Sequence, residues 1–178
     1  MSDRSKNIIA NTLIEIIKTE SFADITISEI CDKSPLVRKT FYNNFKSKND
    51  IIIYVSDKLL KEFVETIHRD GIYTLSHISL LFFKFGLDNK DILILFRDNS
   101  LLLFFTHVFN QYLPHFNNLL RTNKRNVKIT TRIQYVHAFH AAGILKMLFT
   151  WLDTGMKETP EELSKIYTSI VKSKPDFF

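Results

Sequence analysis

The sequence predicts an all-α fold of about nine helices, in which a three-helix N-terminal domain, residues 1–47, precedes a larger helical domain, residues 48–178. Apolar residues recur at helical spacing along nearly the whole chain. The 178 residues include only 4 Gly and 4 Pro, too few for the tight turns of an all-β protein. Hydrophobic residues make up 45%, which is enough to build a core.

Composition also limits the location of the protein and its partners. The single cysteine, Cys31, excludes an internal disulfide framework and fits a reducing compartment. The N-terminus has no secretory pattern, and no uncharged apolar run reaches the roughly 20 residues of a membrane span. We therefore expect a cytoplasmic protein without a membrane partner. A net charge of +5 permits an anionic partner.

Capping patterns mark the helices of the first 70 residues. An amphipathic helix over 5–20 is followed by a T-x-x-E capping box, Thr26 with Glu29, which opens a second helix. That helix should end near residues 33–34, because Pro35 disfavours helix in the residue before it. A third helix over about 37–44 precedes a second capping pattern at 47–50, which opens a helix of about 20 residues ending near residues 70–71.

The remaining segments are more apolar. We expect a loop at 88–90, a short helix over 92–96, a break at 98–100, and a helix over 101–121 that Pro114 kinks or splits. The helix over 129–154 is apolar on all sides, so one side should face a partner chain. Within it, Gly143 would let another helix approach closely. Gly155 ends it, and Thr159 with Pro160 starts the last helix.

A basic cluster surrounds the third helix and predicts contact with DNA. Residues 33–48 contain five basic side chains and no acidic one, and phosphate neutralisation supplies much of DNA affinity. In a helix-turn-helix, the exposed N-terminal residues of the third helix read bases, here Arg38 and Lys39. Tyr42 and Lys48 would contact phosphate, and Thr26 would add a backbone contact at a helix N-terminus. The expected DNA-binding residues are Thr26, Val37, Arg38, Lys39, Thr40, Tyr42, Asn43, Asn44 and Lys48. The alternative is a solvated basic face on an ordinary helical bundle.

Two motifs resemble the TetR family of transcriptional regulators. Residues 40–48 follow a T-F-Y-x-x-F-x-[ST]-K pattern after the capped Thr26, and the similarity extends over about residues 5–60. Residues 151–162 follow a W-x-x-x-G-M-x-x-[ST]-P-E-E pattern of one TetR subgroup. The resemblance implies a non-enzymatic, homodimeric repressor that binds double-stranded DNA at a palindromic site and holds a small apolar ligand in its helical core. It also implies that the last two helices form the dimer interface.

Side chains for the two implied sites come from the C-terminal segments. The expected ligand contacts are Phe83, Phe105, His107, Tyr112, His137 and His140. The expected dimer contacts are Ala142, Phe149, Trp151, Leu163, Ile166, Tyr167 and Ile170. Plain core packing is the alternative for each aromatic residue.

The turn before the third helix departs from the family. Relatives usually have Gly where this chain has Pro35 and a small polar N-cap where it has Val37. Ser34 is able to cap a helix, so the third helix is expected to begin earlier than usual. Three other readings stay open: an adaptor without DNA binding, an activator controlled by a protein partner, and a helical enzyme or small-molecule carrier.

The remaining residue patterns give weaker indications of function. His137 and His140 lie i, i+3 on one helix, but no Cys, Asp or Glu clusters beside them, so no metal site is expected. Cys31 fits a buried structural role. The sequence contains no phosphate-binding Gly loop and no hydrolase or metalloprotease motif, and we predict neither catalysis nor a cofactor.

Overall fold

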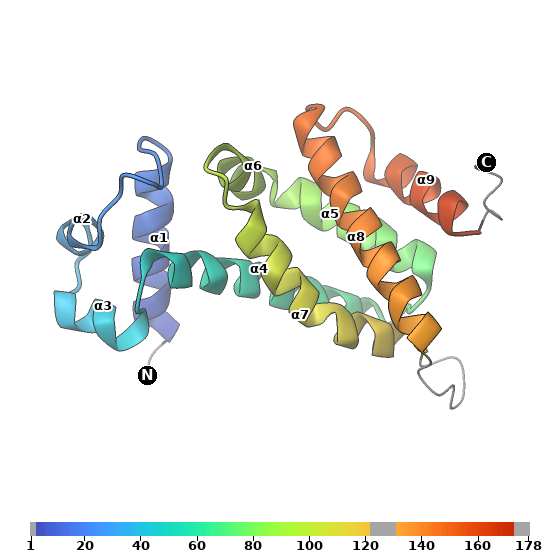
Figure 1. Ribbon diagram of the computed structural model, residues 1–178, viewed down its shortest axis with the longest axis horizontal. Helices are drawn as coiled ribbons and strands as arrows, with labels where there is room; N and C mark the ends of the chain where they lie inside the picture. The colour runs from blue at the N-terminus through green and yellow to red at the C-terminus, as the bar shows by residue number, and fades with distance from the viewer. Residues whose placement is uncertain (1–2, 122–130, 173–178) are drawn as a thin grey trace. The chain divides into compact units, whose positions relative to one another are not determined.

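The computed structural model of the chain describes residues 3–121 and 131–172, with the side chains of 117–121, 131–134 and 137 left aside. The described residues form nine helices and no strand (Figure 1), which confirms the all-α prediction. None of these helices is long and apolar enough to cross a membrane. The helices are α1 (Asp3–Ile17), α2 (Ile27–Lys33), α3 (Arg38–Asn44), α4 (Lys48–Asp70), α5 (Leu75–Asp88), α6 (Lys90–Asp98), α7 (Leu102–Arg121), α8 (Thr131–Asp153) and α9 (Pro160–Lys172).

Most predicted boundaries are confirmed by local hydrogen bonds. The Thr26 hydroxyl accepts the backbone N–H of Glu29 at 3.2 Å and caps α2. At the start of α4, the Asp50 carboxylate accepts the N–H of Ser47 at 3.1 Å, and the Ser47 hydroxyl accepts the N–H of Asp50 at 3.2 Å. Gly71, with φ +67°, follows the end of α4. These boundaries were predictable because caps depend on residues three or four positions apart.

Two predicted interruptions are less complete than expected. The expected loop at 88–90 shrinks to Asn89, whose backbone N–H donates to the Phe85 carbonyl at 3.1 Å. In α7, Pro114 lies inside a helix that continues to Arg121 without being split. The break at 98–100 is confirmed, since Ser100 adopts φ +59° between α6 and α7.

Packing divides the chain into two compact units. The first comprises Met1–Leu59 with Ile94–Val108, and the second comprises Leu60–Leu93 with Phe109–Phe178. Three helices, α4, α6 and α7, therefore contribute residues to both units. The division expected at residue 47 concerns function and stays a prediction.

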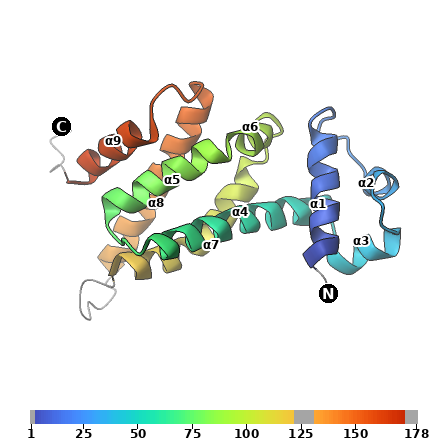
Figure 2. The same ribbon diagram turned by 180° about the vertical axis from the view of Figure 1, so that it is seen from behind.

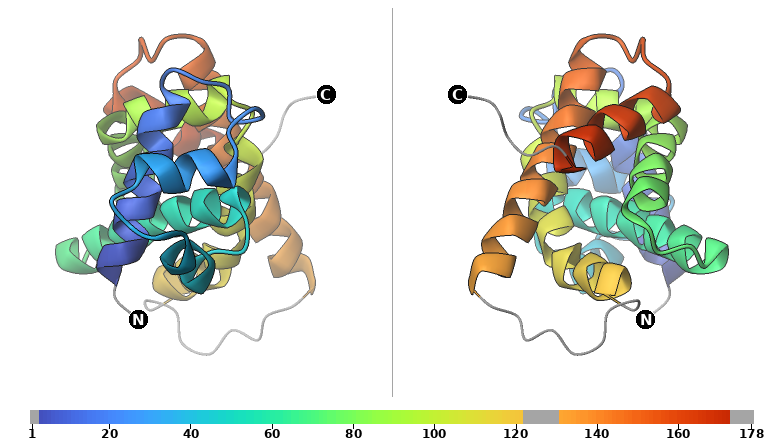
Figure 3. Two further views of the ribbon diagram at one scale, coloured as in Figure 1. Left: turned by 90° about the vertical axis from the view of Figure 1, so that its left-hand side faces the viewer. Right: turned by 90° about the vertical axis from the view of Figure 1, so that its right-hand side faces the viewer.

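The first unit is organised around the three N-terminal helices (Figure 3, left). Their apolar faces meet the first half of α4 in a core that includes Ile9, Leu13, Ile30, Phe41, Phe45, Ile51 and Ile52, all almost completely buried. The connection between α1 and α2 is also held from outside the three helices, because Asn99 Oδ1 accepts the Phe22 N–H at 2.9 Å. The core thus fixes which faces of α2 and α3 remain open to solvent.

The second unit is an aromatic helical bundle in which α5 packs along α9 (Figure 2). Rings of Phe63, Phe82, Phe109 and Phe116 form a continuous chain with centroid separations of 5.6 to 5.8 Å. Gly86 lets α5 approach α8, because a Cβ at this position would lie 2.5 Å from Leu148 Cδ1. Glycine is therefore acceptable inside α5, because its missing side chain leaves room for Leu148.

The W-x-x-x-G-M-x-x-[ST]-P-E-E motif builds the corner between α8 and α9. Gly155, with φ +82°, donates its N–H to the Leu152 carbonyl, and Met156 donates its N–H to the Trp151 carbonyl, the two bonds of a Schellman motif. The indole N–H of Trp151 donates to the Glu158 carbonyl at 3.1 Å. Trp151, Gly155 and Met156 of the pattern therefore each shape this corner through hydrogen bonds within the chain.

The start of α9 completes this corner. The Thr159 hydroxyl accepts the N–H of Glu162 at 3.2 Å, and the Glu162 carboxylate accepts the N–H of Thr159 at 2.8 Å. These bonds lower the pKa of Glu162, with the backbone N–H of Thr159 as the main cause. The predicted start of the last helix at Thr159 and Pro160 is confirmed, and these two bonds form a capping box.

Candidate functional site

The turn between α2 and α3 is built from extended residues. Ser34 has φ −91° and ψ 143°, and its hydroxyl accepts the Leu36 N–H at 3.3 Å instead of capping α3. The expectation of an earlier start for α3 is therefore wrong, because Pro35 holds Ser34 in the extended region. Val37 precedes α3 without a side-chain cap. Instead, the Arg38 guanidinium hydrogen-bonds to the Ser28 hydroxyl and joins α3 to α2.

The outer face of α3 carries most of the residues predicted for DNA binding. Val37 is 71% exposed and Tyr42 56%, and Arg38, Lys39 and Asn43 are also exposed. Thr26 is exposed at the start of α2. Phe41 is buried on the opposite side of α3 and holds the helix on the core.

Two other predicted residues are turned toward their own helix. Thr40 and Asn44 are half-buried, and the Asn44 amide donates to the Thr40 carbonyl at 2.7 Å. The packing therefore concentrates the accessible side chains of α3 near its N-terminal turn and around Tyr42.

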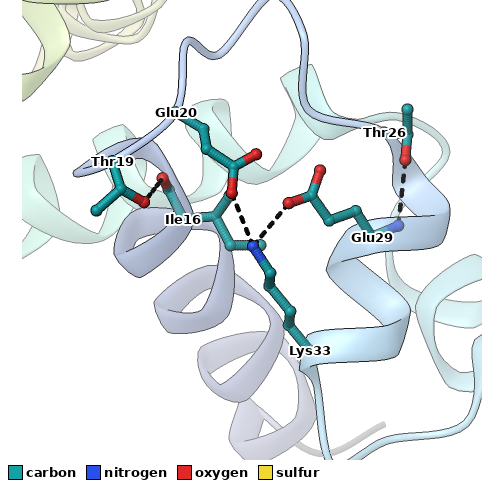
Figure 4. Close-up of polar contacts among 6 residues, drawn as sticks. All are labelled: Ile16, Thr19, Glu20, Thr26, Glu29 and Lys33. Carbon is teal, nitrogen blue, oxygen red and sulfur yellow. Dashed lines mark hydrogen bonds and ion pairs between the residues drawn. The ribbon is translucent and has the colours of Figure 1, made fainter.

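Lys33 has a role within the protein that the sequence did not reveal. Its ammonium lies 2.8 Å from Glu20 Oε1 and 2.7 Å from Glu29 Oε1 (Figure 4). The hydrogen bond to Glu20 is the main cause of a raised pKa for Lys33, and the bond to Lys33 lowers the pKa of Glu29. Two carboxylates thus compensate this lysine, so its charge adds little to an anion-binding surface.

Lys48 is committed to backbone oxygens. Its ammonium donates to the carbonyls of Phe22 at 2.6 Å, Ala23 at 2.9 Å and Ile25 at 2.7 Å. It also lies 4.7 Å from the centre of the Phe22 ring. An ammonium has three N–H donors, and all three are used here. Lys48 therefore fastens the α1–α2 connection, which differs from the phosphate contact predicted for it. Of the five basic residues, Arg38, Lys39 and Lys46 remain exposed without a carboxylate partner in the described residues.

The second unit contains a cavity of about 410 Å³, within the size range of small-molecule sites. Its wall is mainly aliphatic and aromatic, with polar atoms from Tyr73, Ser79, His140 and Tyr167. Burial lowers the pKa of His140 and raises the pKa of Tyr167 to about 12, so both side chains are neutral at pH 7. The lining residues are Phe63, Tyr73, Leu75, Ile78, Ser79, Phe82, Phe109, Leu113, Phe116, Val136, His140, Ala141, Ile144, Tyr167 and Val171.

Among the predicted ligand contacts, His140 lines this cavity. Phe83 instead points toward Trp151, at a centroid distance of 6.2 Å, while its neighbour Phe82 reaches the cavity. Phe105 is buried in the first unit, and His107 is exposed. Tyr112 stacks beside Phe116 at 6.3 Å without lining the cavity, and the side chain of His137 lies outside the described residues.

The ligand wall was hard to predict because adjacent helical residues point about 100° apart. A run such as residues 82–83 therefore divides between two environments. Ser79, which sequence analysis passed over, is buried, and its hydroxyl lies 2.8 Å from that of Ser164. Tyr73 was missed because it lies on the connection between α4 and α5.

The outer sides of α8 and α9 carry a cluster of exposed apolar side chains. Tyr135 is 74% exposed, Phe139 70%, and Ile166 and Ile170 45% each. Ala142 is exposed, and a Cβ on Gly143 would meet nothing within 4 Å. Monomeric proteins rarely leave such clusters uncovered. We call this set the α8–α9 face: Tyr135, Phe139, Ala142, Gly143, Ile166 and Ile170.

The other predicted interface residues lie inward. Trp151, Leu163 and Tyr167 are buried in the second unit, and Phe149 is half-buried. Trp151 belongs to the α8–α9 corner and Tyr167 to the cavity wall, which explains why these residues are apolar. The all-round apolar character of α8 thus arises from two surfaces, one buried in the core and one exposed.

A three-helix head with an exposed basic α3, attached to a helical unit with a cavity, defines the class of helix-turn-helix transcriptional regulators. Residues 73–173, more than half of the 178, match the family model of the TetR-type transcriptional regulator C-terminal region. The chain therefore belongs to the TetR family of transcriptional regulators, which bind DNA and are not enzymes.

Solved structures support the same fold. The TetR transcriptional regulator of Streptococcus agalactiae 2603V is 22% identical with a TM-score of 0.69, covering 96% of this chain and 95% of that one. The fatty acid degradation regulator FadR of Bacillus halodurans is 14% identical with a TM-score of 0.67, covering 97% and 96%. The dihydroxyacetone kinase operon activator DhaS is 19% identical with a TM-score of 0.58, covering 96% and 93%. A search among curated proteins found no match.

Proposed function

We propose that this TetR-family regulator is a homodimeric, ligand-responsive repressor that binds a palindromic operator in the cytoplasm. The observation that carries the proposal is the combination of exposed Arg38, Lys39 and Tyr42 on α3 with the uncovered α8–α9 face. One such α3 reads only a half-site, and a second copy supplies the other half-site about 34–36 Å away.

Base reading is assigned to the N-terminal turn of α3. Arg38 and Lys39 present donors that suit the acceptor edges of guanine. The bond between Arg38 and Ser28 holds the guanidinium at the α2–α3 junction. Tyr42 and Asn43, one turn further on, are placed to contact phosphate or sugar. Lys48 is removed from the predicted DNA contacts and becomes a positioning residue.

DNA binding is tested by selecting sites from random DNA and then measuring affinity as a function of salt. Arg38→Ala, Lys39→Ala and Tyr42→Ala should each weaken binding by about 1–3 kcal/mol or reduce the salt slope by about 1. Lys33→Ala is the matched control, because its charge is already compensated by two carboxylates. Full affinity in all three α3 variants, or selection of sites with no inverted repeat, would rule out the proposed reading of DNA.

Dimerisation is assigned to the α8–α9 face. Phe139, Ile166 and Ile170 supply apolar area, and the small side of α8 at Ala142 and Gly143 permits a close approach of a second helix. Ile170→Glu and Phe139→Glu should produce monomers in sedimentation experiments, because a buried unpaired charge is costly. Ile72→Glu is the matched control, since Ile72 is 49% exposed on the connection between α4 and α5. Dimers that survive both substitutions would move the interface elsewhere.

Ligand response is assigned to the cavity of the second unit. Its apolar wall and neutral polar groups suit an uncharged small molecule. A neutral solvatochromic dye should bind the wild-type protein and change its affinity for the selected operator, as differential binding to two conformations requires. Ala141→Phe, which fills the wall, should abolish dye binding, whereas Ala142→Phe on the exposed side of α8 should leave it intact. Equal dye binding by both variants would exclude this cavity.

The alternative within the same family is an activator controlled by a protein partner. The similar fold of a protein described as an operon activator motivates the comparison. A reporter gene placed behind the selected operator separates the two functions. Deleting the regulator raises expression from a repressed promoter and lowers it from an activated one.

A further inference from the structure

Two histidines from different helices of the second unit lie in contact. His68 lies in the last turn of α4 and His115 in α7, 47 residues apart, and both are exposed. Their Nε2 atoms lie 3.2 Å from each other. Tyr73, on the connection from α4 to α5, places its hydroxyl 3.4 Å from His68 Nδ1. This pair is not used by the DNA-binding face, the α8–α9 face or the capping motifs.

We propose that His68 and His115 together bind one divalent transition-metal ion through their two Nε2 atoms. Two imidazole nitrogens at ordinary bond lengths of about 2.0–2.1 Å stand about 2.9 Å apart at a right angle and about 3.3 Å apart at a tetrahedral angle. The observed separation of 3.2 Å lies between these values. The two nitrogens are therefore spaced to share a metal ion with only small side-chain rotations.

Tyr73 supports the tautomer that metal binding requires. A histidine that coordinates through Nε2 carries its proton on Nδ1, and that N–H is normally donated to an oxygen of the surrounding shell. The Tyr73 hydroxyl oxygen is positioned to accept this proton from His68. In this tautomer the Nε2 lone pair of His68 is free for the metal. The 3.2 Å contact between the rings places an Nε2 hydrogen of one of them between the two nitrogens. To bind the metal, that ring exchanges this hydrogen with solvent and takes up a proton on Nδ1, which leaves both Nε2 lone pairs for the metal.

The site is open and favours particular metals. No group of three or more His, Cys, Asp or Glu side chains forms a metal site among the described residues. The neighbouring His77 is engaged by Asp70, at 3.0 Å. Two imidazoles leave the other coordination positions of the metal to water or to an added ligand. Catalytic metal sites likewise keep a position open, whereas structural sites are closed by protein ligands. Because affinity rises toward Cu²⁺ along the divalent series, Cu²⁺ should bind most tightly, ahead of Ni²⁺ and Zn²⁺.

The proposed metal site lies beside the cavity of the second unit. Tyr73 lines that cavity, and the ring of His115 lies beside Phe116, another lining residue, at a centroid distance of 6.4 Å. A metal held by both histidines ties the end of α4 to α7 across this part of the wall. The metal site does not depend on the proposed repressor function, because it requires only the second unit to be folded.

The test is a calorimetric titration of untagged, chelator-treated full-length protein with Cu²⁺, Ni²⁺ and Zn²⁺. The expected result is one Cu²⁺ per chain, with about a 100-fold loss of affinity in His68→Ala and His115→Ala. Tyr73→Phe should lose about tenfold, because it removes the hydroxyl that orients His68. The double histidine variant should bind more weakly than either single one, because each single variant keeps one imidazole ligand. His107→Ala on α7 is the matched control and should bind like the wild type.

Folding of each variant is checked separately, so that a loss of metal binding is not caused by unfolding. Circular dichroism melts in the presence of chelator should be unchanged in the exposed histidine variants, and added Cu²⁺ should raise Tm only where both histidines are present. The electron paramagnetic resonance spectrum of bound Cu²⁺ should show two equatorial nitrogens. Absence of stoichiometric binding, unchanged affinity in His68→Ala and His115→Ala, or loss of binding in His140→Ala instead would overturn the proposal.

Discussion

Replacing Lys48 with methionine separates two roles that this lysine is able to play in a DNA-binding protein. Methionine keeps the apolar stem but removes the three N–H groups that reach the carbonyls of Phe22, Ala23 and Ile25. If Lys48 holds the α1–α2 connection, the variant loses stability. If Lys48 instead contacts phosphate, the variant loses mainly the salt dependence of DNA binding.

The size of the stability loss follows from the three bonds. Hydrogen bonds from a charged donor contribute about 1.5–3 kcal/mol each. The bonds to Phe22 and Ile25 are partly buried, and the bond to Ala23 is exposed and counts for little. Two bonds at the lower end of the range give a loss of about 3 kcal/mol. For a chain of this length that corresponds to a decrease in Tm of about 6–12 °C.

The assay pairs thermal unfolding with DNA titrations over a range of salt concentrations. Lys48→Met should lower Tm and keep the wild-type salt slope at a temperature where it is folded. Lys39→Met, which alters an exposed lysine of α3, should keep Tm and reduce the salt slope by about 1. An unchanged Tm in Lys48→Met together with a reduced salt slope would refute the positioning role and restore the phosphate contact.

Three further substitutions test the second unit. Gly86→Ala should destabilise the protein by about 1–3 kcal/mol in denaturant titrations, because its Cβ would lie 2.5 Å from Leu148 Cδ1. Combining it with Leu148→Ala should recover part of this loss. If the effects of the two substitutions simply add, the contact does not exist. Trp151→Phe should lower the free energy of unfolding by about 1 kcal/mol, because it removes the indole N–H bond to Glu158. Hydrogen exchange should also show faster opening of residues 154–159. Unchanged exchange would mean that Gly155, and not this bond, stabilises the corner. Burial raises the pKa of Tyr167 to about 12, so between pH 10 and 12 the unfolded chain releases a proton that the folded chain keeps, and stability falls as pH rises. Tyr167→Phe should flatten this alkaline decrease, and an ultraviolet titration in which every tyrosine ionises near pH 10 would disprove the shift.

Much of the fold was predictable because its signals are local. The capping boxes at Thr26 and Thr159 and the left-handed Gly71 and Gly155 each depend on residues a few positions apart. Pro114 does not split α7, because a proline inside a helix is tolerated when packing along the rest of the helix outweighs one lost hydrogen bond. The predicted loop at 88–90 was wrong for a related reason, since polar residues between two helices need not form an extended connection.

The candidate sites were less predictable because they depend on distant partners. Phe82 and Phe83 are chemically identical neighbours, and only the direction of α5 decides that Phe82 lines the cavity while Phe83 packs against Trp151. A partner-facing side of the last two helices was predicted, but the predicted residues omitted the exposed Tyr135 and Phe139 and included Trp151, whose indole is buried. Periodicity indicates that a helix has two buried sides, without indicating which side its own chain covers.

The sequence by itself determined the helices, their caps and a basic α3 with the pattern of the TetR family. Only the tertiary structure decided which charges on that head remain available to DNA. Lys33 is compensated by Glu20 and Glu29, and Lys48 is bound to three backbone carbonyls. The physical reason is that capping and helix periodicity act within one or two turns, whereas a charge is compensated by whichever groups the fold brings within a few ångströms, at any distance along the chain.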